Sequence, residues 1–407
     1  PIASVFAHNH SPEWKTYEVV TALSLVDAAS QATQGWIPLP LIADTNYFKT
    51  VSIKTETNAR TSIVKSTSGQ AQMIWAEWNE DGADRTIKVT TTIATRESRL
   101  ALWQANHVKH LLENQGHQVT LMGMTTMGDQ ILDQPLSKVG GKGLFIKELE
   151  VALASGAAHI AVHSLKDVPM DLPEGFHLAC ILAREDPRDA WVSPHFDSLE
   201  SLPHGAVVGT SSLRRTVLLQ ALRPDLKIEP LRGNLDTRLK KLDDGQYAGI
   251  VLAAAGLKRL DLKDRIRHIF DLRTMIPAAG QGAIGIEIST NRMDLIQTLA
   301  SLNDITTAVA VYAERGVSRA MGGSCSMPLA AHATIAQGTL SIHAAWGDHL
   351  KAGTALIHAH DQKSIDLHDP QALTLASALG ESVARKLIAQ GAIPSTQPSA
   401  PLNAPPH

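Results

Sequence analysis

Short segments rich in β-branched residues alternate with amphipathic helical segments between about residues 87 and 256, and this alternation limits the fold more than any other feature. Residues 87–94 (IKVTTTIA) are predicted to form a strand, and Ser98 is placed to cap a helix over residues 99–114 that ends before Gly116. The next predicted elements are strands at 119–124 and 159–165 and a helix at 144–154. Strands and helices in alternation predict βαβ units on a mainly parallel sheet.

The same alternation recurs after residue 200. The predicted strands lie at 206–210, 226–231 and 248–256, and the predicted helices lie at 211–222 and 235–242. We therefore expect an α/β fold of two doubly wound lobes, like those of periplasmic binding proteins, with a ligand cleft between them. From about residue 305, one helix (307–321) is followed by alternating segments such as TLSIHAAW, which indicates a small α+β C-terminal domain.

This pattern divides the chain into five expected parts. They are an unassigned N-terminal extension (1–85), α/β domain 1 (86–185 plus about 280–303), α/β domain 2 (186–279), an α+β domain 3 (304–393) and a proline-rich tail (394–407). The extension shows no sustained helical or strand repeat, so we interpret it as a poorly ordered or separately folded leader. Its acidic residues argue against a transit peptide, and the composition of the tail predicts disorder.

Charge and composition exclude several classes of protein. The chain has 37 Lys and Arg against 40 Asp and Glu, which argues against a nucleic-acid surface along the whole chain but leaves a local basic pocket open. Two cysteines cannot form a disulfide framework and suit a reducing compartment. No apolar stretch is long enough for a membrane helix, and no secretory signal pattern is found. We expect a soluble, cytoplasmic protein without a nucleic-acid or membrane partner.

The segment GTSSLRR (209–215) is a candidate anion site. A strand ends there, and the first turn of the next helix offers backbone N–H groups, hydroxyls and the guanidinium groups of Arg214 and Arg215. More arginines follow the ends of other predicted strands: Arg96, Arg99, Arg232 and Arg238. This distribution predicts a ligand with several negative groups. The alternative is a set of solvated arginines on helix surfaces.

A second candidate is Asp167, in the segment HSLKDVPMDLP (163–173). Asp167 follows a buried strand and precedes Val168–Pro169, which forces an extended or turned chain. A carboxyl group at this point is suited to donate a proton or to stabilise a cationic intermediate. The alternative is a turn-forming Asp with an Asx-type hydrogen bond.

A third candidate is Cys325, in the glycine-bearing loop MGGSCSMP (321–328). A loop cysteine can serve as a covalent anchor or a nucleophile, and the alternative is a small buried apolar residue. Cys180, in the apolar run FHLACILA, fits that alternative.

Other motifs give no site. GQGAIG (280–285) matches a dinucleotide-binding string but leads into a strand-like run, and VGGKGLF (139–145) lacks the spacing of a phosphate-binding loop. Eighteen histidines include no convincing metal-ligand spacing, so no metal site is predicted.

Taken together, these residues resemble the porphobilinogen deaminase (hydroxymethylbilane synthase) family. The resemblance runs from about residue 87 to 393, and its motifs occur in this order: ATRESRLALWQA, KVGGKGLFIKELE, AVHSLKDVP, REDPRDA, VGTSSLRR, LRGN, AGLKRL, PAAGQGA and GGSC. It implies a monomeric transferase of heme biosynthesis with three domains. Such an enzyme joins four porphobilinogen molecules head to tail, releases ammonia at each step and forms the linear tetrapyrrole hydroxymethylbilane.

The resemblance also implies residue roles. Cys325 matches the cysteine that carries a dipyrromethane cofactor as a thioether, and Asp167 matches the catalytic acid that stabilises the azafulvene-like cation left when ammonia departs. The remaining cofactor-binding positions are Lys142, Phe145, Ser212, Arg214, Arg215 and Arg238. The substrate-binding positions are Arg96, Ser98, Ser211, Arg232, Arg259 and Gln281, and Arg184 falls at a motif position in the same cleft.

The sequence departs from the family pattern at a few positions. Arg99 stands where members often have proline, Met127 stands where a basic residue is common, and Ser326–Met327 follow the loop cysteine in place of the frequent Gln–Val. These departures concern substrate contacts and leave Asp167 and Cys325 in place. An alternative of another class is a non-catalytic, two-lobed anion-binding protein, which would give no reason for a loop cysteine.

Overall fold

The computed structural model describes six strands within residues 3–76 and the residues 87–130, 146–292, 294–323, 327–351 and 355–395. The roles expected of Lys142, Phe145 and Cys325, and the disorder expected of residues 396–407, lie outside the described residues. None of the helices in the described part of the chain combines the length and the apolar character of a bilayer-spanning segment.

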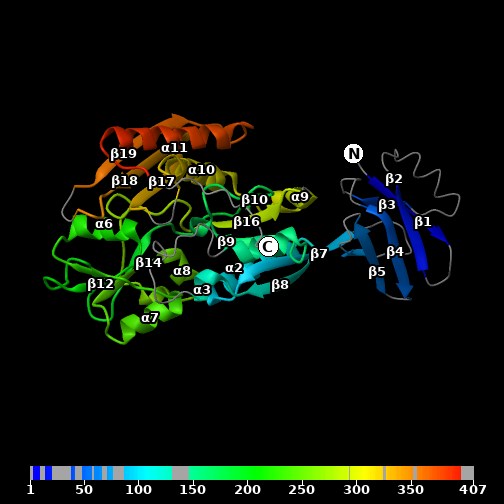
Figure 1. Ribbon diagram of the computed structural model, residues 1–407, viewed down its shortest axis with the longest axis horizontal. Coiled ribbons are helices and arrows are strands. Elements are labelled where there is room, and N and C mark those ends of the chain that lie inside the picture. The colour runs from blue at the N-terminus through cyan, green and yellow to red at the C-terminus, as the bar shows by residue number, and fades with distance from the viewer. Residues whose placement is uncertain are drawn as a thin grey trace, which may run out of the picture.

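Six strands lie in the N-terminal extension, where the sequence pattern indicated no regular element. They are β1 (Ala3–Asn9), β2 (Trp14–Val20), β3 (Pro38–Leu41), β4 (Phe48–Glu56), β5 (Ala59–Ser66) and β6 (Ala71–Ala76). All of them pair antiparallel, and β6 pairs with the first residues of β7 (Ile87–Arg96). Figure 1 shows β1–β5 standing apart from the other elements, beyond β7. The boundary at residue 85 stays a prediction.

The first α/β unit, called lobe 1 here, contains one sheet with the strand order β8-β7-β9-β16-β10. Its further strands are β8 (Gln118–Met124), β9 (Ile160–Ser164), β10 (Phe176–Ile181) and β16 (Ile284–Ser289). Its helices are α2 (Arg99–Glu113), α3 (Met127–Gln130), α5 (Lys147–Ala154) and α9 (Asp294–Ala300). Ser98 caps α2 as predicted, by accepting a hydrogen bond from the Ala101 N–H.

The second α/β unit, lobe 2, has the strand order β13-β12-β14-β11-β15. Its strands are β11 (Asp189–Val192), β12 (Val207–Gly209), β13 (Lys227–Glu229), β14 (Gly249–Ala253) and β15 (His268–Ile269). Its helices are α6 (Leu213–Leu222), α7 (Leu235–Asp243), α8 (Ala254–Arg259) and the 3₁₀ turn η2 (Lys263–Arg265). The predicted strand 248–256 is wrong at its end, because the small, helix-favouring residues after Ala253 turn the chain into α8.

The two sheets share one plan. In each sheet, three strands from βαβ units run parallel, as predicted, and a fourth strand (β16 or β11) is antiparallel. The chain reaches β11 by leaving lobe 1 after β10, and it reaches β16 by returning from lobe 2, so it crosses between the lobes twice. Gly282 lies in the return crossing with a φ of +88°, and a Cβ there would lie 2.4 Å from the Glu185 carbonyl oxygen. Because glycine has no Cβ, the two crossing segments can lie in contact at this point.

The third domain packs two helices, α10 (Ile305–Ala320) and α11 (Ala372–Ala389), on a three-stranded antiparallel sheet. The strands are β17 (Leu329–Ala336), β18 (Thr339–Trp346) and β19 (Ile357–Ser364). Apolar residues of this domain belong to the same buried clusters as residues of both lobes. Ala308 and Val311 share a cluster with Leu165 of lobe 1, and Ala330 and Ala345 share a cluster with Trp191 of lobe 2. Figure 1 shows this domain lying along one side of the two lobes. The predicted α/β fold with two lobes and a small α+β C-terminal domain is confirmed.

Candidate active site

Asp167 lies at the end of β9, in a 3₁₀ turn, η1 (Leu165–Asp167), that the neighbouring residues hold firmly. Leu165 and Val168 are fully buried, and the Leu165 N–H donates to the Ala283 carbonyl at 3.0 Å. Asp167 itself is half-buried. Among the described residues no hydrogen bond involves its carboxylate, so the Asx-type turn is not observed there. The carboxylate is therefore positioned by the backbone and is open to a ligand.

Lys166, the residue before Asp167, was not singled out from the sequence. Burial lowers the pKa of its ammonium group to about 8, and the positive charges of Arg215 and Arg214 act in the same direction, against the opposing effect of Asp167. These couplings place Lys166 among the arginines of lobe 2. The only signal in the sequence was its position beside Asp167.

Arg214 and Arg215 lie on the first turn of α6 and share one buried carboxylate, Asp189, which is fully buried. Arg214 Nη1 donates to Asp189 Oδ2 at 2.7 Å, and Arg215 donates to Asp189 Oδ1 from Nη2 at 2.7 Å and from Nε at 3.2 Å. Gln281 Nε2 donates to the same Oδ1 at 2.9 Å. The two arginines are only 4% and 5% exposed, so the alternative of solvated arginines on a helix surface does not apply to this pair.

Asp189 was also missed in the sequence. Burial alone would raise the pKa of its carboxyl group, but the charges and hydrogen bonds of Arg214 and Arg215 outweigh burial and hold the pKa far below its usual value. Asp189 is therefore ionised. It lies in the REDPRDA motif, but nothing in that motif identifies its partners.

The hydroxyl groups of GTSSLRR support the local structure. Ser212 caps α6 by accepting a hydrogen bond from the Arg215 N–H, and the Ser211 hydroxyl donates to the Leu231 carbonyl at 2.9 Å. These contacts fix the start of the helix that carries the arginine pair.

Arg238 and Arg232 complete the cationic cluster. Arg238, on α7, donates from Nε to the Gly233 carbonyl at 2.9 Å, and burial lowers its pKa to about 10, with Arg215 and Arg232 acting in the same direction and Asp167 against it. Burial also lowers the pKa of Arg232. The structure thus brings together Asp167 and cations from η1, α6, α7 and the loop before α7.

Arg96 and Arg99, by contrast, are paired with carboxylates of the protein. Arg96 makes a bidentate ion pair with Asp129, and the hydrogen bonds from Arg96 and Thr126 outweigh burial to lower the pKa of Asp129. Arg99 donates from Nη1 to Asp236 Oδ1 on α7 at 3.1 Å, and therefore connects lobe 1 with lobe 2.

The guanidinium groups of Arg259 and Arg184 also bind groups of the protein itself. Arg259 Nη2 donates to the Gly282 carbonyl at 2.7 Å, its guanidinium lies 5.7 Å from the Trp103 ring centre, and burial lowers its pKa to about 10. Arg184 pairs with the fully buried Glu314 of the third domain and so connects two parts of the chain.

The charges of this cluster define the ligand it can hold. Five cations surround the carboxylates of Asp167 and Asp189. Within the described ranges, two buried side-chain atoms, Arg214 Nε and Gln281 Oε1, have no hydrogen-bond partner. The five cations are Lys166, Arg214, Arg215, Arg232 and Arg238. An anion with several carboxylates fits this arrangement. In the described ranges no group of three or more potential ligands could hold a metal ion.

Two family models match the sequence. The model for the porphobilinogen deaminase dipyromethane cofactor binding domain covers residues 91–297, and the model for the porphobilinogen deaminase C-terminal domain covers residues 308–389.

Curated proteins named porphobilinogen deaminase are similar over nearly their whole length. The protein of Albidiferax ferrireducens is 66% identical over 73% of this chain and 93% of its own length. The protein of Burkholderia mallei is 56% identical over 77% of this chain and 94% of its own length. A solved nutrient-binding protein from Burkholderia cenocepacia, bound to methionine, is 16% identical with a TM-score of 0.34, over 52% of this chain and 90% of its own. A likeness this distant supports no statement about function.

Proposed function

The chain belongs to the porphobilinogen deaminase family, and we propose that Asp167 is the catalytic acid of the reaction that it carries out. The chain polymerises four porphobilinogen molecules head to tail into hydroxymethylbilane, with release of ammonia at each addition, and it uses a dipyrromethane cofactor as primer. The alternative of a non-catalytic anion-binding protein is not favoured, because both family models and the similar curated proteins are deaminases.

One observation carries the role of Asp167: its carboxylate has no hydrogen-bond partner among the described residues, yet it lies in a cluster of cations. Porphobilinogen carries a protonated aminomethyl group, so ammonia leaves as a neutral molecule with the bonding electron pair when the carbon–nitrogen bond breaks. The positive charge stays on the pyrrole. A fixed, half-buried carboxylate next to that charge stabilises it, because partial burial reduces the screening of the attraction by water.

The residues present fit a dipyrromethane cofactor. Its acetate and propionate groups need cations, and the buried Arg214 Nε is a donor that lacks an acceptor among the described residues. When bound, the cofactor supplies the pyrrole end to which the first substrate is joined. From the resemblance to the family, we assign its carboxylates to Lys142, Ser212, Arg214, Arg215 and Arg238 and contact with its rings to Phe145, of which Lys142 and Phe145 lie outside the described residues.

We propose Cys325 as its covalent anchor. The last described residue before this loop is Gly323, and a Cβ at Gly323 would lie 3.4 Å from the Met170 side chain, three residues after Asp167. The loop of Cys325 therefore begins beside the segment that carries Asp167, which supports its role.

The residues proposed to bind substrate are supported by different observations. Arg232 belongs to the cationic cluster, so we assign it to a substrate carboxylate. Arg96, Arg259, Ser98, Ser211 and Gln281 already contact protein groups, and we propose that they bind substrate through their remaining hydrogen-bonding capacity or fix its surroundings. Resemblance to the family supports a cytoplasmic monomer, which sedimentation of the purified chain tests.

The experiment for Asp167 replaces it with Asn, which keeps the shape and removes the charge. Loss of a positioned acid lowers turnover by about 100-fold or more. The matched control is Asp171→Asn, because Asp171 lies four residues away and forms an exposed ion pair with Arg319. Turnover of Asp167→Asn within a few-fold of the unmodified chain would reject the assignment.

A further inference from the structure

We propose that Asp189 is a positioning residue that holds Arg214 and Arg215 as one rigid pair, with fixed donors directed at the carboxylates of the cofactor, of the chain that grows from it and of the incoming substrate. This inference rests on the proposed function of the arginine cluster. It adds a residue that never touches the ligand but determines how the ligand is bound.

Asp189 accepts four hydrogen bonds from three side chains. Arg214 occupies Oδ2, while Arg215 and Gln281 share Oδ1. Both guanidinium groups are planar forks, so fixing one or two of their nitrogens fixes the direction of the others. The orientation of the arginine pair is therefore set by one carboxylate.

The nitrogens that Asp189 does not engage are the ones left for a ligand. In the described part of the chain, Arg215 uses Nε and Nη2 on Asp189, and its Nη1 makes no hydrogen bond. Arg214 uses Nη1 on Asp189 and on the Ile276 carbonyl, and its buried Nε has no acceptor. A buried donor without an acceptor is costly, and a bound carboxylate would satisfy it.

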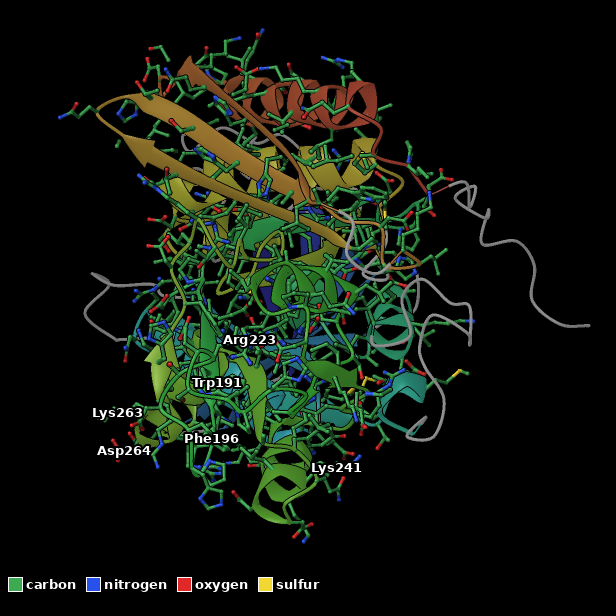
Figure 2. All side chains as sticks on the ribbon, turned by 90° about the vertical axis from the view of Figure 1, so that its left-hand side faces the viewer. Trp191, Phe196, Arg223, Lys241, Lys263 and Asp264 are labelled. Carbon is green, nitrogen blue, oxygen red and sulfur yellow. The ribbon has the colours of Figure 1, made fainter. Side chains whose placement is uncertain are left out.

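Asp189 is itself held in place. It begins β11, where it pairs with Ala253 of β14, and its carbonyl accepts a hydrogen bond from the Phe270 N–H at 3.0 Å. Two residues later, the fully buried Trp191 donates from its ring nitrogen to the Phe196 carbonyl, and Figure 2 shows both residues in lobe 2. The anchored strand gives the carboxylate little freedom.

Rigidity matters because two long side chains would otherwise lose conformational freedom each time a ligand binds. Asp189 also offsets repulsion among Arg214, Arg215 and the half-buried Lys166. Without this carboxylate the cations would move apart, and their donors would no longer converge on one site.

The test is Asp189→Asn in the full chain, with porphobilinogen as substrate. Because the arginine pair binds carboxylates before and after reaction alike, we expect KM to rise more than kcat falls, with kcat/KM lower by about 100-fold. The matched control is Asp225→Asn, since Asp225 binds Arg223 through the same two nitrogens elsewhere in lobe 2. Figure 2 labels Arg223. We expect its KM to stay unchanged even if its melting temperature falls.

Two results would overturn the inference. One is a folded Asp189→Asn with an unchanged KM. The other is a loss of kcat/KM in both variants that follows their loss of melting temperature. If Asp189→Asn does not fold, Asp189→Glu keeps the charge and moves it by one methylene; it should still raise KM, and an unchanged KM would contradict positioning. The Asp167→Asn variant separates the cases: if it is inactive while Asp189→Asn is normal, only the positioning role fails.

Discussion

Arg184 donates two hydrogen bonds to the fully buried carboxylate of Glu314, at 2.6 and 3.1 Å, and so connects the first crossing between the lobes to α10 of the third domain. Glu314 also accepts hydrogen bonds from the backbone N–H groups of Gly280 and Ala333. Burial would raise its pKa, but Arg184 and His332 lower it to about 2. One carboxylate therefore joins both crossings and the third domain; the first crossing leads into Asp189 at the start of β11, and the return crossing carries Gln281.

The first prediction concerns Glu314→Gln. Removing one partner of a buried ion pair leaves the other charge buried and uncompensated, so the free energy of unfolding should fall by about 3–5 kcal/mol. Asp361→Asn in the same domain is the control, because the Asp361–Lys386 pair is partly exposed and should contribute less than about 1 kcal/mol. Urea denaturation measures both, and equal losses would contradict the prediction.

The second prediction concerns pH. Glu150 on α5 is buried near Glu287, and burial, reinforced by that second carboxylate, raises its pKa to about 7. A raised pKa means that the folded state binds the proton more tightly than the unfolded state, so the stabilisation is present below the usual Glu pKa and is lost as the pH rises through 7. The free energy of unfolding of Glu150→Gln, minus that of the unmodified chain, should therefore be larger at about pH 8.5 than at about pH 6. A difference in unfolding free energy that is the same at both pH values would refute this.

The third prediction concerns Arg99, which stands where family members often have proline. Its ion pair with Asp236 is about half exposed, so Arg99→Ala should change the free energy of unfolding by less than about 1 kcal/mol. Because the pair connects α2 to α7, its loss should increase the radius of gyration in small-angle X-ray scattering. High salt should have the same effect on the unmodified chain. Identical scattering of both proteins at low salt would count against a connecting role.

The fourth prediction concerns Cys180. Burial raises the pKa of its thiol to about 12, so the thiol is protonated and inert in the folded protein, as the sequence pattern indicated. If Cys325 is blocked as a thioether, iodoacetamide should label no cysteine in the native protein and only Cys180 after denaturation. Labelling of two cysteines after denaturation would show that Cys325 is free.

The sequence pattern predicted those features that depend on residues close together in the chain. The strand before Asp167, the cap at Ser98 and the arginine-bearing start of α6 all follow from residues close together in sequence. Asp189 and Glu314 could not be found this way, because their partners lie far along the chain: Gln281 is 92 residues from Asp189, and Arg184 is 130 residues from Glu314. A carboxylate next to an arginine in a motif does not reveal which arginine it will bind.

The most direct test of the account is the intact mass of the purified, unmodified chain together with that of Cys325→Ser. We predict a mass above that of the bare chain by two porphobilinogen units less two ammonia molecules, and the loss of this increment in the variant. A chain that has its bare mass, and that forms no tetrapyrrole from porphobilinogen, would contradict the central claim.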